Sequence, residues 1–137
     1  MSKQAEHLFT QFCSGYENRD LSLLLSLFTQ EAIMWGSAID EYRVGLAQIE
    51  AQLQRDWQQS DHGQIKVGAF IPTKEDEPWT AAINTAKLVI AGEEYEFEQL
   101  RGTITIAQEE GQWKIAHMHA SFPDYRNSEN SSFPVGA

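Results

Sequence analysis

Two histidines and a serine stand at alternate positions near the end of the chain. In the stretch 113–123, His117, His119 and Ser121 follow Trp113 at two-residue steps. If this stretch is a β-strand, these side chains share one face of the sheet. Imidazole titrates near neutral pH and serves as a general acid or base. We therefore expect this face to line a pocket that holds the polar end of a small molecule, with His117 and His119 as candidate catalytic groups.

An arginine stands on the strand expected just before this one. In the stretch 95–106, Arg101 alternates in step with Gln99, so the two side chains share a face. A guanidinium in a mostly apolar cavity requires an acidic partner or an anionic ligand. Arg101 therefore either recognises a carboxylate, with Gln99 beside it, or forms an internal ion pair with Glu98 or Asp40.

Aromatic residues supply candidate walls for the pocket. Trp35 lies on a short expected strand, and Tyr16 ends the first expected helix, from which its hydroxyl could enter the cavity. Tyr42 and Trp57 are further candidates, since small-molecule pockets commonly use aromatic walls. Packing in the core is the alternative for each of them.

The sequence gives no reason to expect a metal or a cofactor. The spacing of His117 and His119 lets two imidazoles approach one ion, but zinc sites use three or four protein ligands and a third is not assignable. Cys13 is the only cysteine, which excludes an internal disulfide and a cysteine-rich zinc site.

Composition places the chain among compact single-domain proteins. It has 137 residues, 42% of them hydrophobic and 22% charged. We expect one domain over residues 1–123 and a polar tail over 124–137. The net charge of −10 disfavours nucleic acid and anionic membranes as partners. The N-terminus lacks the pattern of a secretory signal and no apolar run reaches about 20 residues, so we expect a cytoplasmic protein.

Hydrophobic periodicity predicts helices first and strands afterwards. Three-to-four-residue steps favour helices over 2–19, 21–28 and a segment that follows Gly45. A short strand is expected over 32–36. Branched and aromatic residues between turn signals indicate four longer strands, over 64–70, 79–91, 95–106 and 112–122. This order predicts an α+β domain with one sheet curled around the helices.

The order of elements and several short motifs resemble a known superfamily. The motifs are Tyr16-Glu17-Asn18-Arg19-Asp20, Leu27-Phe28-Thr29, Asp40-Glu41, Gly45 and the final Trp-x-Ile-x-His-x-His-x-Ser. Over about residues 5–123 the chain resembles the nuclear transport factor 2-like superfamily, and within it the SnoaL-like branch. The resemblance implies a cone-shaped, mostly antiparallel sheet wrapped around three N-terminal helices, a cystatin-like α+β barrel with an internal pocket. Members include steroid isomerases, polyketide cyclases, dehydratases and binding-only modules.

Two further comparisons bear on the site. The C-terminal strands of the chain are also similar to the association domain of calcium/calmodulin-dependent kinases. That domain has an arginine in its pocket, and the resemblance implies that Arg101 stands at the matching position. Steroid isomerases of this fold carry a catalytic aspartate where this chain has Gly36, and a helix tyrosine where it has Phe12. Chemistry of that kind is therefore not expected, because the base is missing. Asp40 could replace it only if its loop folds inward.

These observations predict a small-molecule-binding domain whose pocket takes a small acidic or polar-ended organic ligand. One alternative is an isomerase, cyclase or dehydratase that uses a pocket histidine or Asp40. Another is a non-catalytic dimerisation or assembly domain. A homodimer is expected through an apolar outer face of the sheet. The residues expected on that face are Leu88, Ile90, Leu100, Ile104, Ile106, Ala116 and Met118.

Overall fold

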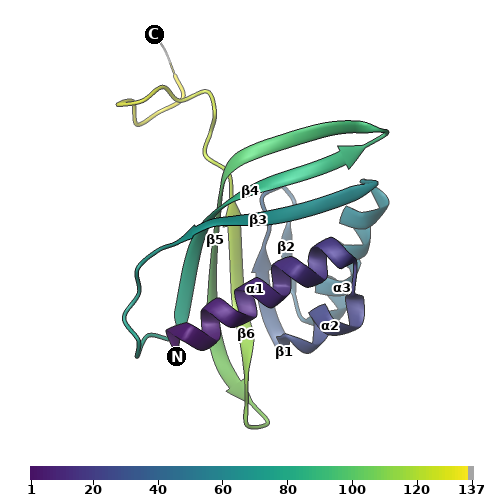
Figure 1. Ribbon diagram of the computed structural model, residues 1–137, viewed down its shortest axis with the longest axis vertical. Helices are drawn as coiled ribbons and strands as arrows, with labels where there is room; N and C mark the ends of the chain where they lie inside the picture. The colour runs from purple at the N-terminus through teal and green to yellow at the C-terminus, as the bar shows by residue number, and fades with distance from the viewer. Residues whose placement is uncertain (136–137) are drawn as a thin grey trace.

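A computed structural model of the protein describes residues 1–135 and contains three helices and a six-stranded sheet (Figure 1). In chain order the elements are α1 (Ser2–Asn18), α2 (Leu21–Ser26), β1 (Phe28–Trp35), β2 (Tyr42–Val44), α3 (Leu46–Gln58), β3 (His62–Phe70), β4 (Trp79–Ile90), β5 (Glu93–Glu109) and β6 (Gln112–Ser121).

The helices follow the predicted periodicity closely. In α1 the apolar stripe that includes Leu8, Phe9 and Phe12 is buried. The side chain of Asp20 accepts a hydrogen bond from the backbone N–H of Leu23 at 3.1 Å and so caps α2. This helix is shorter than expected, because β1 begins at Phe28.

The sheet is curved, and its strands follow the order β2-β1-β6-β5-β4-β3. All neighbouring strands are antiparallel except β1 and β6. The expected α+β class and the curved sheet are confirmed. The sheet is not closed, since β2 and β3 form its two edges, so the expected barrel is open on one side. In Figure 1, α1 crosses the hollow side of the sheet, and it contacts β3, β4, β5 and β6.

Two β-bulges decide which side chains face this hollow side. On β6 the pairing register shifts between Ile115 and His117, and both Ile115 and Met118 are buried. On β5 it shifts between Phe97 and Leu100, next to Gln99 with φ of 62°. An extra residue in one strand interrupts the alternation, so the side chains beyond it change faces.

The core lies between the helices and the hollow, concave face of the sheet. Leu100, Ile104, Ile106 and Met118 are all buried there. The expectation that they form an apolar outer face is therefore wrong. It is also wrong for Leu88 and Ile90, which line a cavity on the same concave face. Strict alternation, continued through the bulges, had assigned these side chains to the convex face.

Other differences from the sequence expectations are local. The short strand β2 was not expected, since three residues give too little periodicity to detect. The expected tail over 124–137 contacts the sheet near its start, since the Tyr125 hydroxyl donates a hydrogen bond to the backbone carbonyl of Glu98. Its residues 136 and 137 lie outside the described part. Within residues 1–135 we find no helix with the length and apolar character needed to span a membrane.

Candidate ligand pocket

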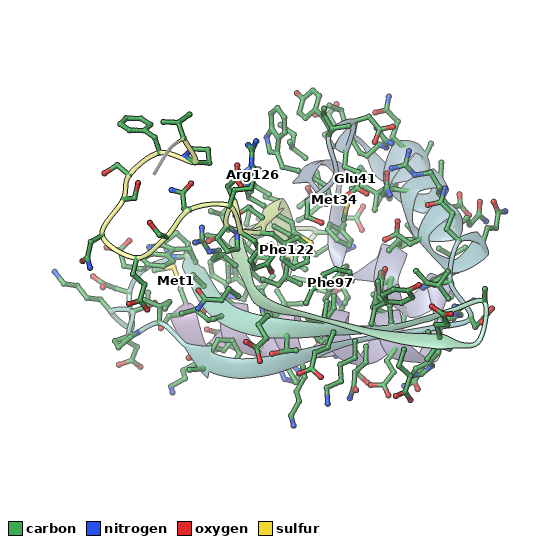
Figure 2. The ribbon with its side chains drawn as sticks, turned by 90° about the horizontal axis from the view of Figure 1, so that it is seen from above. Met1, Met34, Glu41, Phe97, Phe122 and Arg126 are labelled. Carbon is green, nitrogen blue, oxygen red and sulfur yellow. The ribbon has the colours of Figure 1, made fainter. Side chains whose placement is uncertain are left out.

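A cavity of about 460 Å³ lies between the concave face of the sheet, the end of α1 and one side of α3. Its walls are mainly apolar, and they include Phe12, Met34, Leu88, Phe97 and Phe122. Figure 2 labels three of these residues together with Glu41, which also lines the cavity. This size and lining are typical of a site for a small organic molecule.

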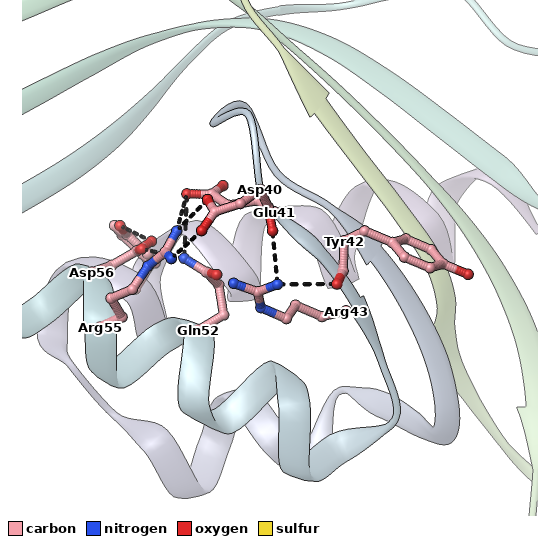
Figure 3. A network of polar contacts seen from close by, with 8 residues as sticks. Asp40, Glu41, Tyr42, Arg43, Gln52, Arg55 and Asp56 are labelled. Atoms are coloured by element: carbon pink, nitrogen blue, oxygen red, sulfur yellow. Dashed lines mark hydrogen bonds and ion pairs between the residues drawn. The ribbon is translucent and has the colours of Figure 1, made fainter.

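One wall of the cavity is polar and forms a continuous hydrogen-bond network (Figure 3). The Tyr16 hydroxyl donates to Asp56 Oδ2 at 2.8 Å. Gln52 Nε2 donates to Asp56 Oδ1 at 2.7 Å and to Glu41 Oε1 at 3.3 Å. Gln52 and Asp56 lie four residues apart on α3, so both side chains point the same way. Both carboxylate oxygens of Asp56 are thereby satisfied.

Tyr16 is fixed as a hydrogen-bond donor in this network. Burial raises the pKa of its phenol far above the usual value, and the neighbouring carboxylate of Asp56 raises it further. Desolvation disfavours the charged phenolate, and the nearby negative charge does the same. The hydroxyl therefore remains protonated over the physiological range and donates to Asp56.

Arg55 binds the carboxylates of two adjacent residues, Asp40 and Glu41, and these two side chains differ in exposure. Its guanidinium donates to both carboxylate oxygens of Asp40, at 2.8 and 3.1 Å, and to Glu41 Oε1 at 3.3 Å. These hydrogen bonds lower the pKa of Asp40. The Asp40 side chain is 62% exposed, whereas that of Glu41 is 15% exposed. Asp40 does not line the cavity, so the residue that the loop turns inward is Glu41.

Gly36 makes room for the Glu41 carboxylate. A Cβ atom at position 36 would lie 1.8 Å from Glu41 Oε2, which is far closer than atoms can approach. The backbone N–H of Gly36 also donates to the carbonyl of Glu41 at 2.8 Å, which ties the loop back to the end of β1. The carboxylate therefore occupies the space that a side chain at position 36 would fill.

The expected histidine pocket does not form. His117, His119 and Ser121 are not among the residues that line the cavity, because the bulge near Ala116 directs them to the convex face. Met118 and Ala120 line the cavity in their place. The expectation that the imidazoles face the pocket is therefore corrected.

Arg101 and Gln99 also lie outside the cavity. Both are exposed on β5, and Arg101 pairs across the sheet with Ser121 and Ile83. Within residues 1–135, Arg101 forms neither of the expected ion pairs, with Glu98 or with Asp40. On the convex face a guanidinium is solvated and needs no buried partner.

The aromatic candidates divide into two groups. Tyr16 and Trp35 line the cavity. Trp57 packs behind Tyr16, with ring centroids 6.2 Å apart, and Tyr42 stacks on Trp35 at 4.3 Å. Neither Trp57 nor Tyr42 is a lining residue, and Tyr42 is half exposed. Any role of these two in binding stays a prediction of the sequence.

Sequence reasoning missed Glu41, Gln52 and Asp56. The last two continue the buried stripe of Ile49 and Leu53 at helical spacing, and that signal was available. A polar residue inside an apolar stripe is a candidate for a pocket wall. Glu41 carried no such signal, because its inward position depends on the contacts of its loop with β1 and α3.

A third metal-binding partner for the histidines is not seen either. Over the described range 1–135, no cluster of three or more histidine, cysteine, aspartate or glutamate side chains is placed to hold a metal ion. The carboxylates of the polar wall are held instead by Tyr16, Gln52 and Arg55.

Comparison with known proteins places the fold. No curated protein matches the sequence. A proposed aromatic ring hydroxylase from Novosphingobium aromaticivorans is 19% identical, with a TM-score of 0.74 over 85% of each chain. An NTF2-like protein of unknown function from Burkholderia pseudomallei is 12% identical, with a TM-score of 0.72 over 90% of this chain and 92% of its own.

An LEH-like epoxide hydrolase from Mycobacterium tuberculosis is 14% identical, with a TM-score of 0.71 over 90% of this chain and 86% of its own. At these identities the likeness shows the fold alone. The sequence profile of the SnoaL-like domain matches residues 5–125, which is most of the chain and all of its regular secondary structure after the first turn of α1. The chain therefore belongs to the SnoaL-like domain family, with an NTF2-like fold.

Proposed function

We propose that this protein binds a small organic molecule in the cavity between α1, α3 and the concave face of the sheet. The observation that carries the proposal is an open space of about 460 Å³ with apolar walls and a single hydrogen-bonded polar wall. A domain that served assembly alone would gain stability by filling such a space with side chains.

The polar wall argues for a polar-ended ligand and against an acidic one. Glu41 and Asp56 line the cavity, whereas Arg101, the residue expected to recognise an anion, lies on the convex face. A ligand carboxylate would meet two like charges in a partly desolvated site. The apolar body of the ligand would lie against residues such as Phe97 and Phe122.

Binding of naphthol, a fluorescent apolar molecule with a hydroxyl at one end, tests the proposal. Ala120 lines the cavity, and Ala120→Phe would fill part of it. We expect this variant to weaken naphthol binding by about tenfold or more, equivalent to about 1.4 kcal/mol. Ala107→Phe on β5, outside the cavity lining, is the matched control. Equal affinity of the Ala120→Phe variant and the parent, both folded by circular dichroism, would contradict the proposal.

A second candidate function is proton-transfer catalysis at Glu41. Among the described residues, Oε1 of this carboxylate accepts the hydrogen bonds from Arg55 and Gln52, and Oε2 accepts none. A held carboxylate with one free oxygen in a cavity is suited to act as a general base. The names of two structural neighbours, a proposed hydroxylase and an epoxide hydrolase, support catalysis within this fold.

The test of catalysis uses any ligand that the binding assay identifies. The ligand is incubated with the protein in D₂O and followed by NMR for deuterium incorporation at carbon or for a new product. We expect exchange or turnover with the parent and neither with Glu41→Gln. A bound ligand that stays unchanged with the parent would favour binding without catalysis.

We also propose that the convex face pairs with a second copy of the chain. Apolar side chains near the two edges of this face are half exposed, with Val44 at 43% and Ile83 at 44%. Apolar groups at this exposure favour an interface. Sedimentation should show a dimer that Ile83→Lys weakens, and only monomer at micromolar concentration would contradict the proposal.

A further inference from the structure

The hydrogen-bonding atoms that remain free on the polar wall are both acceptors. The Gln52 residue is 3% exposed and lines the cavity, and its Oε1 has no hydrogen-bond partner. Glu41 Oε2 accepts no hydrogen bond from any residue in the range 1–135. Gln52 Oε1 is buried, and a buried acceptor without a donor costs free energy, so it calls for a ligand that supplies a hydrogen. Glu41 Oε2 belongs to a charged carboxylate and is a strong acceptor for the same ligand.

The orientation of the Gln52 amide follows from its neighbours. Its nitrogen contacts two carboxylate oxygens, Asp56 Oδ1 at 2.7 Å and Glu41 Oε1 at 3.3 Å. Turning the amide over would place an acceptor against both of these acceptors, which is unfavourable. The free atom of Gln52 is therefore its oxygen.

Among the described residues, the charged side chains that line the cavity are two carboxylates, those of Glu41 and Asp56. The carboxylates of Asp40 and Glu41 are paired with one guanidinium, that of Arg55, and no guanidinium in the range 1–135 bonds the carboxylate of Asp56 (Figure 3). The guanidinium of Arg43, also in Figure 3, donates to the backbone carbonyls of Asp40 and Tyr42. Arg19 is near the network, but its guanidinium donates to the backbone carbonyls of Trp57 and Ser60.

Within the described range no lysine or arginine lines the cavity. Ser37 and Gln64 also line the cavity, and each side chain can donate or accept a hydrogen bond. They therefore favour neither a positive nor a negative ligand.

The remaining walls suit an apolar body that carries a cation. Phe12, Phe97, Phe122 and Tyr125 line the cavity, and the ring centroids of Phe97 and Phe122 lie 5.8 Å apart. Aromatic rings attract cations through their faces as well as packing against apolar groups.

From these observations we infer that the pocket binds an amine with an apolar body, as its ammonium cation, with the ammonium group hydrogen-bonded to Glu41 Oε2 and Gln52 Oε1. The inference rests on the proposed function and names the chemical class of its ligand. An ammonium group supplies the hydrogens that both acceptors require, and it compensates the excess negative charge. A hydroxyl supplies a single hydrogen and no charge.

The test compares three ligands of matched shape, phenylbutylamine, phenylbutanol and phenylbutyrate, by calorimetry on the parent protein at neutral pH. We expect the amine to bind at least about tenfold more tightly than the alcohol, and the acid to bind most weakly. Ala120→Phe should weaken all ligands that enter the cavity. Because this ranking uses the parent protein, it does not depend on whether a variant folds.

Two variants that each remove one carboxylate charge test whether Glu41 binds the ammonium group. Glu41→Gln should reduce amine affinity by about tenfold and change alcohol affinity less than twofold. Glu31→Gln removes the same charge from an exposed position on β1 outside the cavity, and it should leave both affinities unchanged. Equal losses in the two variants would show a general field effect and overturn the assignment to Glu41.

The outcomes separate this inference from the proposed function. If the alcohol or the acid binds as tightly as the amine, and Ala120→Phe weakens that binding, the pocket functions but the amine inference is overturned. If no ligand of the three binds and naphthol binding is insensitive to Ala120→Phe, both fail. Amine binding that depends on Glu41 and on Ala120 supports both.

Discussion

On the concave face of the sheet, β6 presents Met118 and Ala120 to the cavity, whereas on the convex face the same strand carries His117, His119 and Ser121. The residue types with the most evident chemistry in the sequence therefore lie outside the pocket. The carboxylates inside it come from a loop and from α3. Position relative to a bulge, rather than residue type, decides which groups can act on a ligand.

The difference between the two faces has an energetic reason. A guanidinium or imidazole on the convex face is solvated and needs no protein partner, as for Arg101. A carboxylate at the cavity needs donors, and Asp56 receives them from Tyr16 and Gln52. The polar wall is consequently a preformed network, whereas the convex polar groups are largely independent of one another.

The largest effect that tests this comparison is on stability. Ile104 is fully buried on the concave face, and Ile83 is 44% exposed on the convex face. We expect Ile104→Ala to lower the free energy of unfolding by about 2–5 kcal/mol. Ile83→Ala should lower it by less than about 1 kcal/mol. Urea unfolding measures both. Similar losses at a concentration where the chain is monomeric would contradict the assignment of the two faces.

A smaller effect is expected from Gly36→Ala. The added methyl group would displace the Glu41 carboxylate, so amine affinity should fall by about tenfold, as in Glu41→Gln. Calorimetry on the single variants and the double variant measures the coupling. We expect the double variant to lose no more affinity than either single variant, because both changes act on one group. Additive losses would show that Gly36 acts independently of Glu41.

An alkaline titration sharpens the description of the polar wall. Burial and the neighbouring carboxylate of Asp56 raise the pKa of the Tyr16 phenol. We expect Tyr16 to remain unionised near pH 10, where ordinary tyrosines ionise. The pKa of Tyr16 is higher in the folded state than in the unfolded state. The contribution of the protonated phenol to the free energy of unfolding is therefore complete below about pH 10 and is lost as the pH rises further. Phenolate absorbance of the parent and of Tyr16→Phe measures this.

Tyr16→Phe should leave the absorbance change near pH 10 the same as in the parent, because the buried phenol does not ionise there. A smaller absorbance change in Tyr16→Phe than in the parent would show that Tyr16 is open to solvent.

The smallest effect concerns the convex face. Replacing His117 and His119 by alanine should change ligand affinity by less than about twofold, since neither side chain lines the cavity. The ring centroids of His119 and Trp35 lie 6.3 Å apart, so we expect at most a slight change in ligand affinity, transmitted through Trp35. Calorimetry with the tightest ligand measures it. A large loss would show that the convex face takes part in binding.

Local patterns in the sequence predicted most of the secondary structure. The apolar stripe of α1 and the helix after Gly45 are each set by residues within a few positions of one another. The order of helices before strands was enough to predict the α+β class. Tyr16 and Trp35 are among the residues that line the cavity, and their role in binding a ligand stays a prediction.

Only the tertiary structure decided which residues form the site. The bulges on β5 and β6 shift the strand pairing by one residue, and such a shift exchanges the two faces. Glu41 reaches the cavity because Gly36, Gln52 and Arg55 converge on it from β1 and α3. Sequence alone determines periodicity, which is local, but the identity of the pocket depends on contacts between segments that meet only in the folded chain.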